Sequence, residues 1–146
     1  MNSADTHVDP MPEYFDAPVE RTLIARFVVH GEPVSKARAR VTSRGTFTPA
    51  KTRDAESAVL AAYLKCAPLG MIPKGVMCEL SVQFFNGNRR VRDIDNMLKL
   101  VQDALNEQAY EDDSQIIELH GYKHVVPPVE ARTEVSLYTL IVGGAL

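Results

Sequence analysis

Residues 76–108 have the sequence VMCELSVQFFNGNRRVRDIDNMLKLVQDALNEQ, in which a strand pattern precedes a helix pattern. Apolar residues occupy every second position of the first part, which predicts a β-strand with one buried face. These positions are Val76, Cys78, Leu80, Val82 and Phe84. The run Asn-Gly-Asn at 86–88 is typical of a loop and ends the strand.

A helix is predicted after this loop, with Asp95 as its N-cap and its end near Gln108. Its apolar residues recur at helical spacing and are Leu98, Val101, Ala104 and Leu105. Asp95 and Lys99 are four residues apart, so they share one side of the helix near its start.

The rest of the chain predicts three more strands and one more helix. Residues 21–30 are a largely buried strand, and a helix starts at Thr48-Pro49 and ends before Pro68. Residues 40–48 are either a small hairpin or an extended loop. Residues 116–126 and 133–142 are strands on either side of Pro127-Pro128, and we expect them to be neighbours in one sheet. This order predicts an α+β fold, a two-layer sandwich of a mixed β-sheet with about two helices.

Composition predicts one domain with an acidic tail. The chain has 146 residues, 45% of them hydrophobic, which suits a single compact domain at residues 21–146. Residues 1–20 contain several prolines and acidic residues but no lysine or arginine, so we expect a flexible tail there. Its acidic residues are Asp5, Asp9, Glu13, Asp16 and Glu20.

The cysteines and the apolar runs indicate a cytoplasmic protein. Cys66 and Cys78 form no Cys-x-x-Cys pair, so we expect free buried thiols instead of a zinc site or a disulfide. No apolar run approaches the roughly 20 residues of a membrane helix. The amino terminus is acidic and lacks the basic start and apolar middle of a secretion signal.

Basic residues cluster in two segments. The formal net charge is -3, yet without residues 1–20 the chain has 16 basic and 14 acidic residues. The clustered cations are Lys36, Arg38, Arg40, Arg44, Lys51 and Arg53 in one segment and Arg89, Arg90 and Arg92 in the other. A solvated loop is the alternative for residues 36–53, but six cations without a counter-charge favour contact with the phosphates of DNA.

Acidic residues in the segment 93–113 predict a magnesium site. Asp93 follows the strand-ending loop, Asp95 opens the helix, and Asp112 or Asp113 precedes the next strand, so three carboxylates are able to converge. Converging carboxylates repel each other unless a cation is bound, and magnesium takes oxygen ligands. An EF-hand is excluded because Leu98 stands where that loop needs glycine.

Other polar residues have both ordinary and functional interpretations. Lys99 is either a surface lysine paired with Asp95 or Asp103, or a group that stabilises the charge developing on a cleaved phosphodiester. His120 and His124 share one strand face, where structural or surface roles are favoured over metal binding. Ser114 and Gln115 are interpreted as cap and turn residues that support Asp113.

The chain resembles the RusA family of Holliday junction resolvases. Residues 31–40, GEPVSKARAR, are similar to the family's Gly-x-Pro-x-x-Lys-x-Arg-x-Arg segment. Residues 93–99, DIDNMLK, are similar to its Asp-x-Asp-Asn-x-x-Lys motif, and residues 103–106 and 110–116 resemble the remaining signature in order. Glu107 departs from the pattern, because glycine often follows Asn106 in the family.

This resemblance implies a magnesium-dependent endonuclease that acts as a homodimer on branched DNA, with manganese as a substitute ion. It implies that Asp93, Asp95 and Asp113 are the essential carboxylates and that Lys99 is essential too. The expected activity is resolution of four-way junctions by paired symmetric nicks in recombination and repair, in a bacterial cell or a phage-infected host. Two alternatives stay open: a branched-DNA-binding protein without catalysis, and a structure-selective nuclease of broader range.

Overall fold

The computed structural model describes residues 19–37, 40–66 and 70–142 of the chain. The main elements are β1 (Val19–His30), β2 (Arg40–Thr42), β3 (Gly45–Phe47), α1 (Ala50–Cys66), β4 (Met77–Asn86), α2 (Ile94–Leu105), β5 (Ile116–Val125) and β6 (Arg132–Val142). Two 3-10 turns, η2 (Asp113–Gln115) and η3 (Pro128–Glu130), precede β5 and β6. The tail predicted at residues 1–20 lies outside the described residues, except that Val19 and Glu20 begin β1.

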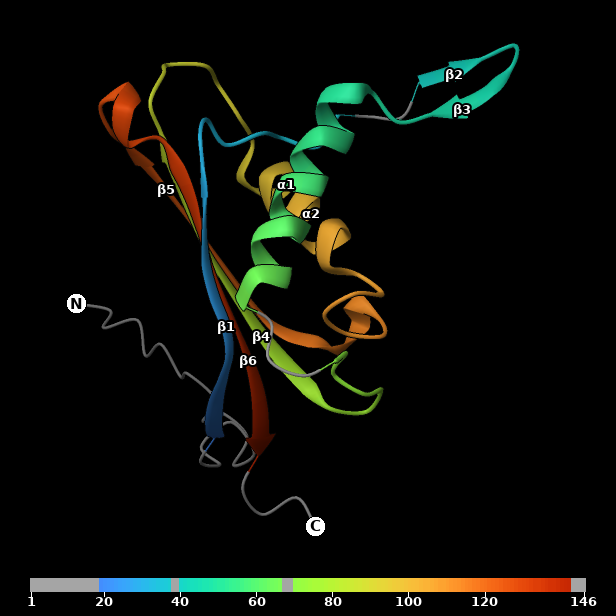
Figure 1. Ribbon diagram of the computed structural model, residues 1–146, viewed down its shortest axis with the longest axis vertical. Coiled ribbons are helices and arrows are strands. Elements are labelled where there is room, and N and C mark those ends of the chain that lie inside the picture. Colours follow the sequence, from blue (N-terminus) through green and yellow to red (C-terminus); the bar gives the residue numbers. More distant parts are fainter. Residues whose placement is uncertain (1–18, 38–39, 67–69, 143–146) are drawn as a thin grey trace, which may run out of the picture.

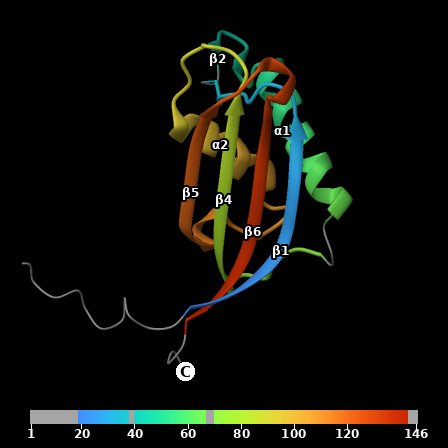
Figure 2. The ribbon, with the colours of Figure 1, turned by 90° about the vertical axis from the view of Figure 1, so that its left-hand side faces the viewer.

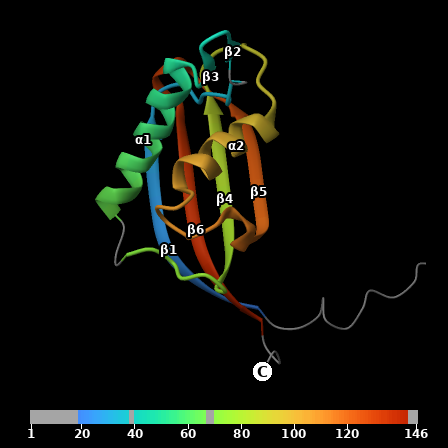
Figure 3. The same cartoon turned by 90° about the vertical axis from the view of Figure 1, so that its right-hand side faces the viewer.

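One four-stranded sheet with the strand order β1-β6-β4-β5 forms the main layer. β5 runs parallel to β4, whereas β6 is antiparallel to both β1 and β4. Both helices cover the same face of this sheet and leave its other face open (Figures 2 and 3). The predicted α+β class, with a mixed sheet and two helices in two layers, is confirmed.

The expectation that the last two strands are neighbours is wrong, because β4 lies between β5 and β6. The connection from β5 to β6 therefore crosses the end of β4, where Val126 N donates to Asn86 O at 2.9 Å. Gly87 makes this crossing possible, since a Cβ atom there would lie 2.6 Å from the Pro128 Cα. The Pro127-Pro128 pair suits such a connection better than a tight hairpin.

Helix α2 packs its apolar stripe against the sheet, as the helical spacing predicted. Its buried residues are Met97, Leu98, Leu100, Val101, Ala104 and Leu105. They meet the predicted buried face of β4 and the inner face of β6 in one core. The N-cap of α2 is Asp93 and not Asp95, because the first helical hydrogen bond runs from Met97 N to Asp93 O at 3.1 Å. Asp95 lies in the first turn.

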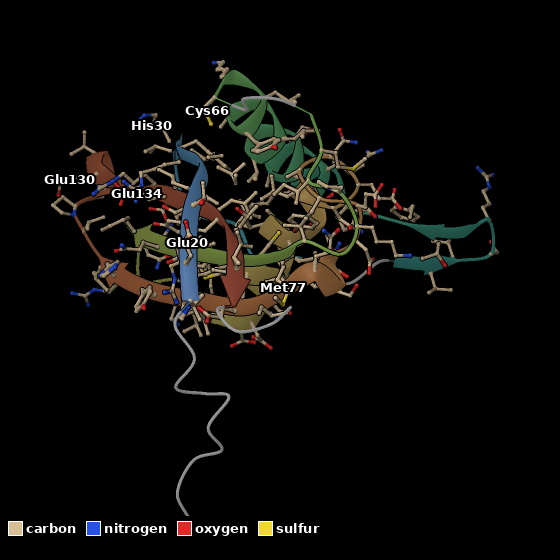
Figure 4. All side chains as sticks on the ribbon, turned by 90° about the horizontal axis from the view of Figure 1, so that it is seen from below. Glu20, His30, Cys66, Met77, Glu130 and Glu134 are labelled. Atoms are coloured by element: carbon tan, nitrogen blue, oxygen red, sulfur yellow. The ribbon has the colours of Figure 1, made fainter. Side chains whose placement is uncertain are left out.

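Residues 40–47 form a hairpin, the first of the two predicted alternatives. Strands β2 and β3 pair with each other in a separate two-stranded sheet. This hairpin projects from the body of the protein (Figures 1 and 4). Its apolar side chains are unprotected, with Val41 81% and Phe47 48% exposed.

The cysteines are both free, as predicted, but only one is buried. Cys78 lies in the core, whereas Cys66 is exposed at the last residue of α1. Among the helices that the structure describes, none is long and apolar enough to cross a membrane.

Candidate metal centre and nucleic-acid interface

The start of α2 presents two exposed carboxylates. Asp93 has an extended backbone, with φ −77° and ψ 130°, and its side chain makes no capping hydrogen bond. Its Oδ2 accepts a hydrogen bond from the Asn96 side-chain amide at 3.5 Å. Asp95 is exposed in the first helical turn. Because both carboxylates are exposed and close in sequence, their oxygens are accessible to an external cation.

Asp103 ties two lysines to the exposed side of α2. Lys99 Nζ lies 3.3 Å from Asp103 Oδ1, so of its two predicted partners Lys99 pairs with Asp103. Lys36 Nζ contacts the same carboxylate and lies 3.3 Å from Glu56 Oε1 on α1. Burial lowers the pKa of Lys36, but the hydrogen bond and charge of Asp103, with Glu56, outweigh it and raise the pKa overall. Lys36 therefore links α1 to α2, and its ammonium is already paired.

Asp112 and Asp113 have different surroundings at the start of β5. The Asp112 carboxylate caps η2 by accepting hydrogen bonds from the Ser114 hydroxyl and from Ser114 N. These bonds, led by the hydroxyl, lower the pKa of Asp112. Gln115 completes the capping box and anchors η2 to the segment before β4. Ser114 and Gln115 are thus turn residues as predicted, but the cap is Asp112, and Ser114 bonds Asp112 instead of Asp113. Asp113 is half-buried, and no side-chain hydrogen bond joins it to another described residue.

One chain does not bring the three predicted aspartates together. Lys123 Nζ donates to Arg92 O at 2.8 Å, so the start of α2 lies beside the second half of β5. Asp113 instead precedes Ile116, the first residue of β5. The seven residue steps from Ile116 to Lys123 span about 23 Å in a strand. The two carboxylates at the start of α2 and the one at the start of β5 are therefore at different ends of that strand.

Another acidic cluster lies on the open face of the sheet. Within the described part of the chain, Glu79, Glu118 and His120 are the one group of three possible metal ligands whose atoms lie within 4.8 Å of one another. The Arg21 guanidinium already pairs with this cluster: it donates one hydrogen bond to Glu79 and another, at 2.9 Å, to Glu118 Oε2. The hydrogen bond from Arg21 lowers the pKa of Glu118. The sequence did not predict this cluster, since it depends on which strands pair; the visible signal was only acidic and histidine residues at outward strand positions.

His120 and His124 share one strand face, as predicted, and this face is the open face of the sheet. His120 Nε2 is 3.4 Å from Glu79 Oε1 and 3.6 Å from Glu118 Oε2. His124 stacks on Phe85 with the ring centroids 4.6 Å apart. Both histidines face away from the start of α2, which agrees with the structural roles favoured for them.

A basic groove of about 510 Å³ lies beside the start of α2. It is bounded by residues 34–37, the start of α1 and the loop at 90–92, and its basic lining residues are Lys36, Lys51, Arg90 and Arg92. Ser35 Oγ also lines it and is buried without a hydrogen-bond partner among the described residues. The groove thus combines basic side chains with a hydroxyl, two kinds of group that contact nucleic-acid phosphates.

Besides Lys36, which is paired with Asp103 and Glu56, the predicted DNA-contacting residues fall into three groups. Arg92 is largely buried and holds its own loop, donating to Asn88 Oδ1 at 3.0 Å and Asn86 Oδ1 at 3.4 Å. The exposed cations are Arg44, Lys51, Arg53, Arg89 and Arg90. Arg38 and the side chain of Arg40 lie outside the described residues.

An α+β domain with this groove beside exposed aspartates defines a small protein suited to bind nucleic acid. Residues 30–138 match the model of a known family, Endodeoxyribonuclease RusA. This match covers most of the chain, which therefore belongs to the RusA family of endodeoxyribonucleases. The predicted resemblance is thus confirmed. No curated protein matches the chain.

Proposed function

We propose that this chain is a magnesium-dependent endodeoxyribonuclease that resolves Holliday junctions by paired symmetric nicks, acting as a homodimer. The family match over residues 30–138 carries the proposal. Its support from geometry is that the motif of residues 93–99 lies at the exposed start of α2, next to the basic groove. A four-way junction has two equivalent strands to cut, so a two-fold dimer matches its symmetry.

Asp93 and Asp95 are the first ligands that we propose for the metal, with Asp113 as the third. All three offer carboxylate oxygens, the donors that magnesium and manganese prefer. Asp113 is favoured over Asp112, because the Asp112 carboxylate is engaged in capping η2. A divalent ion at such a site polarises a phosphate oxygen and lowers the pKa of bound water.

The separation of these ligands leads us to place the third carboxylate in a second copy of the chain. The start of α2 and the start of β5 lie roughly 20 Å or more apart within one copy. A divalent ion contacts carboxylate oxygens at about 2.0–2.6 Å, so one copy cannot supply all three ligands to one ion. A two-fold dimer supplies both sites at once, each with Asp93 and Asp95 from one protomer and the partner's Asp113.

Residues of the chain itself would bind and orient the DNA. The exposed Lys51 and Arg90 are the groove cations that we propose as phosphate contacts. The Lys99 side chain is 54% exposed, so its ammonium would be accessible to the scissile phosphate, and Asp103 would orient it. Arg92 would act indirectly by holding the loop that carries Arg90.

Replacing one carboxylate tests this function. Asp95→Asn keeps the shape of the side chain but removes a charge, so nicking of synthetic four-way junctions with magnesium should fall roughly 100-fold or more. Junction binding should persist, because less negative charge faces the DNA. Asp54→Asn, an exposed aspartate on α1, is the matched control and should cut normally. Normal nicking by Asp95→Asn would show that the proposed site is wrong.

Substrate comparison separates the two alternatives. A junction-binding protein without catalysis would bind four-way DNA and leave it intact at every magnesium or manganese concentration. A nuclease of broader range would cut forks, duplexes or single strands as fast as junctions. We expect preferential cutting of the four-way junction, at two symmetric positions on opposing strands.

A further inference from the structure

The hairpin of β2 and β3 exposes apolar side chains away from the body of the protein. Every residue from Val41 to Phe47 is exposed. The two strands pair with each other in their own sheet and do not join the four-stranded one. A two-stranded hairpin buries little apolar surface by itself, so Val41 and Phe47 face either solvent or an external partner.

The strand register places one apolar residue on each face of the hairpin. Val41 pairs with Thr46, and the next pair along the ladder is Arg40 with Phe47. Residues directly opposite each other share a face, and successive pairs alternate between the two faces. Val41 therefore lies on one face and Phe47 on the other. The hairpin is thus a narrow wedge with an apolar residue on either side.

The tip of the wedge is closed tightly and carries a cation. The Thr42 hydroxyl donates to Gly45 O at 3.1 Å and accepts from Arg44 N at 3.3 Å. Gly45 has a φ of 118°, which glycine adopts without strain. Arg44 is exposed in this turn, and residues 33–53 contain six basic residues and no acidic one. The charge of the hairpin and its flanks therefore complements a polyanion.

Both ends of the hairpin lead into the basic groove. Ala37 before it and Pro49 after it line the groove, as does Lys51 in α1. Phe47 is two residues from Pro49, so their Cα atoms are within about 7 Å of each other. Figure 1 shows the hairpin extending outward from the start of α1. A nucleic acid whose phosphates occupy the groove therefore meets the hairpin.

An apolar wedge fits a branch point better than a continuous duplex. In a duplex each base pair is covered by its neighbours on both sides, so a side chain enters only by unstacking them. At a branch point the strands change partners, so adjacent base pairs separate more easily and their faces become accessible. A wedge with an apolar residue on each face is able to cover two such base pairs at once.

We propose that the β2–β3 hairpin inserts at the branch point of a DNA junction, where Phe47 stacks on one exposed base pair and Val41 covers another. Arg44 at the tip then meets the phosphates that converge where strands are exchanged. This inference rests on the proposed function, because it concerns the same substrate. It adds the element that distinguishes a junction from a duplex.

DNA suits this hairpin better than the same hairpin of a second copy does. Two copies of residues 33–53 would bring like charges together, since this segment has no acidic residue to pair with the other copy's cations. DNA supplies both counter-charge and flat apolar surfaces, and aromatic side chains stack on bases of any sequence. The hairpin would therefore select the shape of the substrate and not its sequence.

Binding measured without a divalent ion tests the hairpin separately from cleavage. Phe47→Ala should weaken binding to a four-way junction about 5- to 150-fold, the range for loss of one base–aromatic stack, and change linear-duplex binding less than about twofold. Phe47→Trp should keep the junction preference, because it restores a ring that stacks. Tyr122→Ala, at an aromatic residue of β5 that is 50% exposed, against 48% for Phe47, is the matched control and should change neither affinity. Equal weakening on both substrates by Phe47→Ala, or no change on either, would overturn the proposal.

A fluorescent base locates the contact. With 2-aminopurine in the base pair beside the branch point, binding of the wild-type chain should change the fluorescence, and binding of Phe47→Ala should change it much less. The same base in the middle of an arm should respond to neither protein. A response in the arm equal to that at the branch point would refute insertion there. Light scattering checks the other occupant: a lower mass for Phe47→Ala than for the wild type would assign the hairpin to a contact between copies.

These outcomes are distinguishable from failure of the proposed function. A chain that prefers junctions through Phe47 but never cuts them would refute the nuclease function and leave the role of the hairpin intact. Conversely, Asp95→Asn could abolish cutting while Phe47→Ala leaves the junction preference unchanged, which would refute the role of the hairpin alone.

Discussion

Gln115 clamps the turn that carries Asp113, and its removal has a predictable cost. Its Nε2 donates to Pro73 O at 2.9 Å and to Val76 O at 3.0 Å, and its Oε1 accepts from Asp112 N at 2.9 Å. The residue itself is only 7% exposed. Each such hydrogen bond contributes about 0.5–1.5 kcal/mol net. Since Pro73 is exposed and water can replace part of this network, Gln115→Ala should lower the free energy of unfolding by about 2 kcal/mol.

Urea unfolding followed by circular dichroism measures this loss. With a urea dependence of about 1–3 kcal/mol per molar, a loss of that size lowers the midpoint by roughly 1 M. Gln108→Ala, at an exposed glutamine after α2, is the control and should stay within about 0.5 kcal/mol of the wild type. A Gln115→Ala midpoint equal to that of Gln108→Ala would refute the clamp. If the clamp holds, junction cleavage should fall as well under conditions where the variant is folded.

Further predictions concern single residues. Glu107 has a positive φ of 61°, where glycine is favoured, so Glu107→Gly should raise the free energy of unfolding by about 0.5–1 kcal/mol in thermal or urea unfolding. The lowered pKa of Asp112 means that its contribution is present above the ordinary aspartate pKa and is lost as pH falls through the lowered value. The stability gap between wild type and Asp112→Ala should therefore shrink on acidification below roughly pH 4. Arg90→Ala should weaken junction binding and lower the salt slope by about 1 without destabilising the fold, whereas Arg92→Ala should destabilise it by about 1.5–3 kcal/mol.

Local sequence patterns predicted the helices and strands themselves better than they predicted which strands are neighbours in the sheet. The alternation in residues 76–85 and the apolar stripe of α2 follow from the periods of strand and helix, and both are present with their predicted buried faces. The order of strands does not follow from any such period. Parallel pairing of β5 with β4 depends on the crossover through α2, and this places β4 where the sequence suggested direct contact between the last two strands.

In the candidate site, too, positions close in sequence were predictable and contacts between distant segments were not. Asp93, Asp95 and Lys99 lie on one helical turn and its cap, so their common location followed from spacing alone. The partners of Lys36 did not, because Asp103 is 67 residues away and meets it only through packing of α1 on α2. The position of Asp113 likewise depends on the direction of β5. A motif contiguous in sequence was predictable, whereas one assembled across the sheet was not.

The separation of the carboxylates has a consequence for control of cleavage. If the partner's Asp113 completes each site, a free monomer holds two of the three ligands and binds the metal weakly. Both sites then form in one event, when two copies associate, so neither strand of a junction is exposed to a lone active site. Coupling metal binding to dimer formation would thus favour two cuts per encounter over a single nick, which is the outcome that resolution of a four-way junction requires.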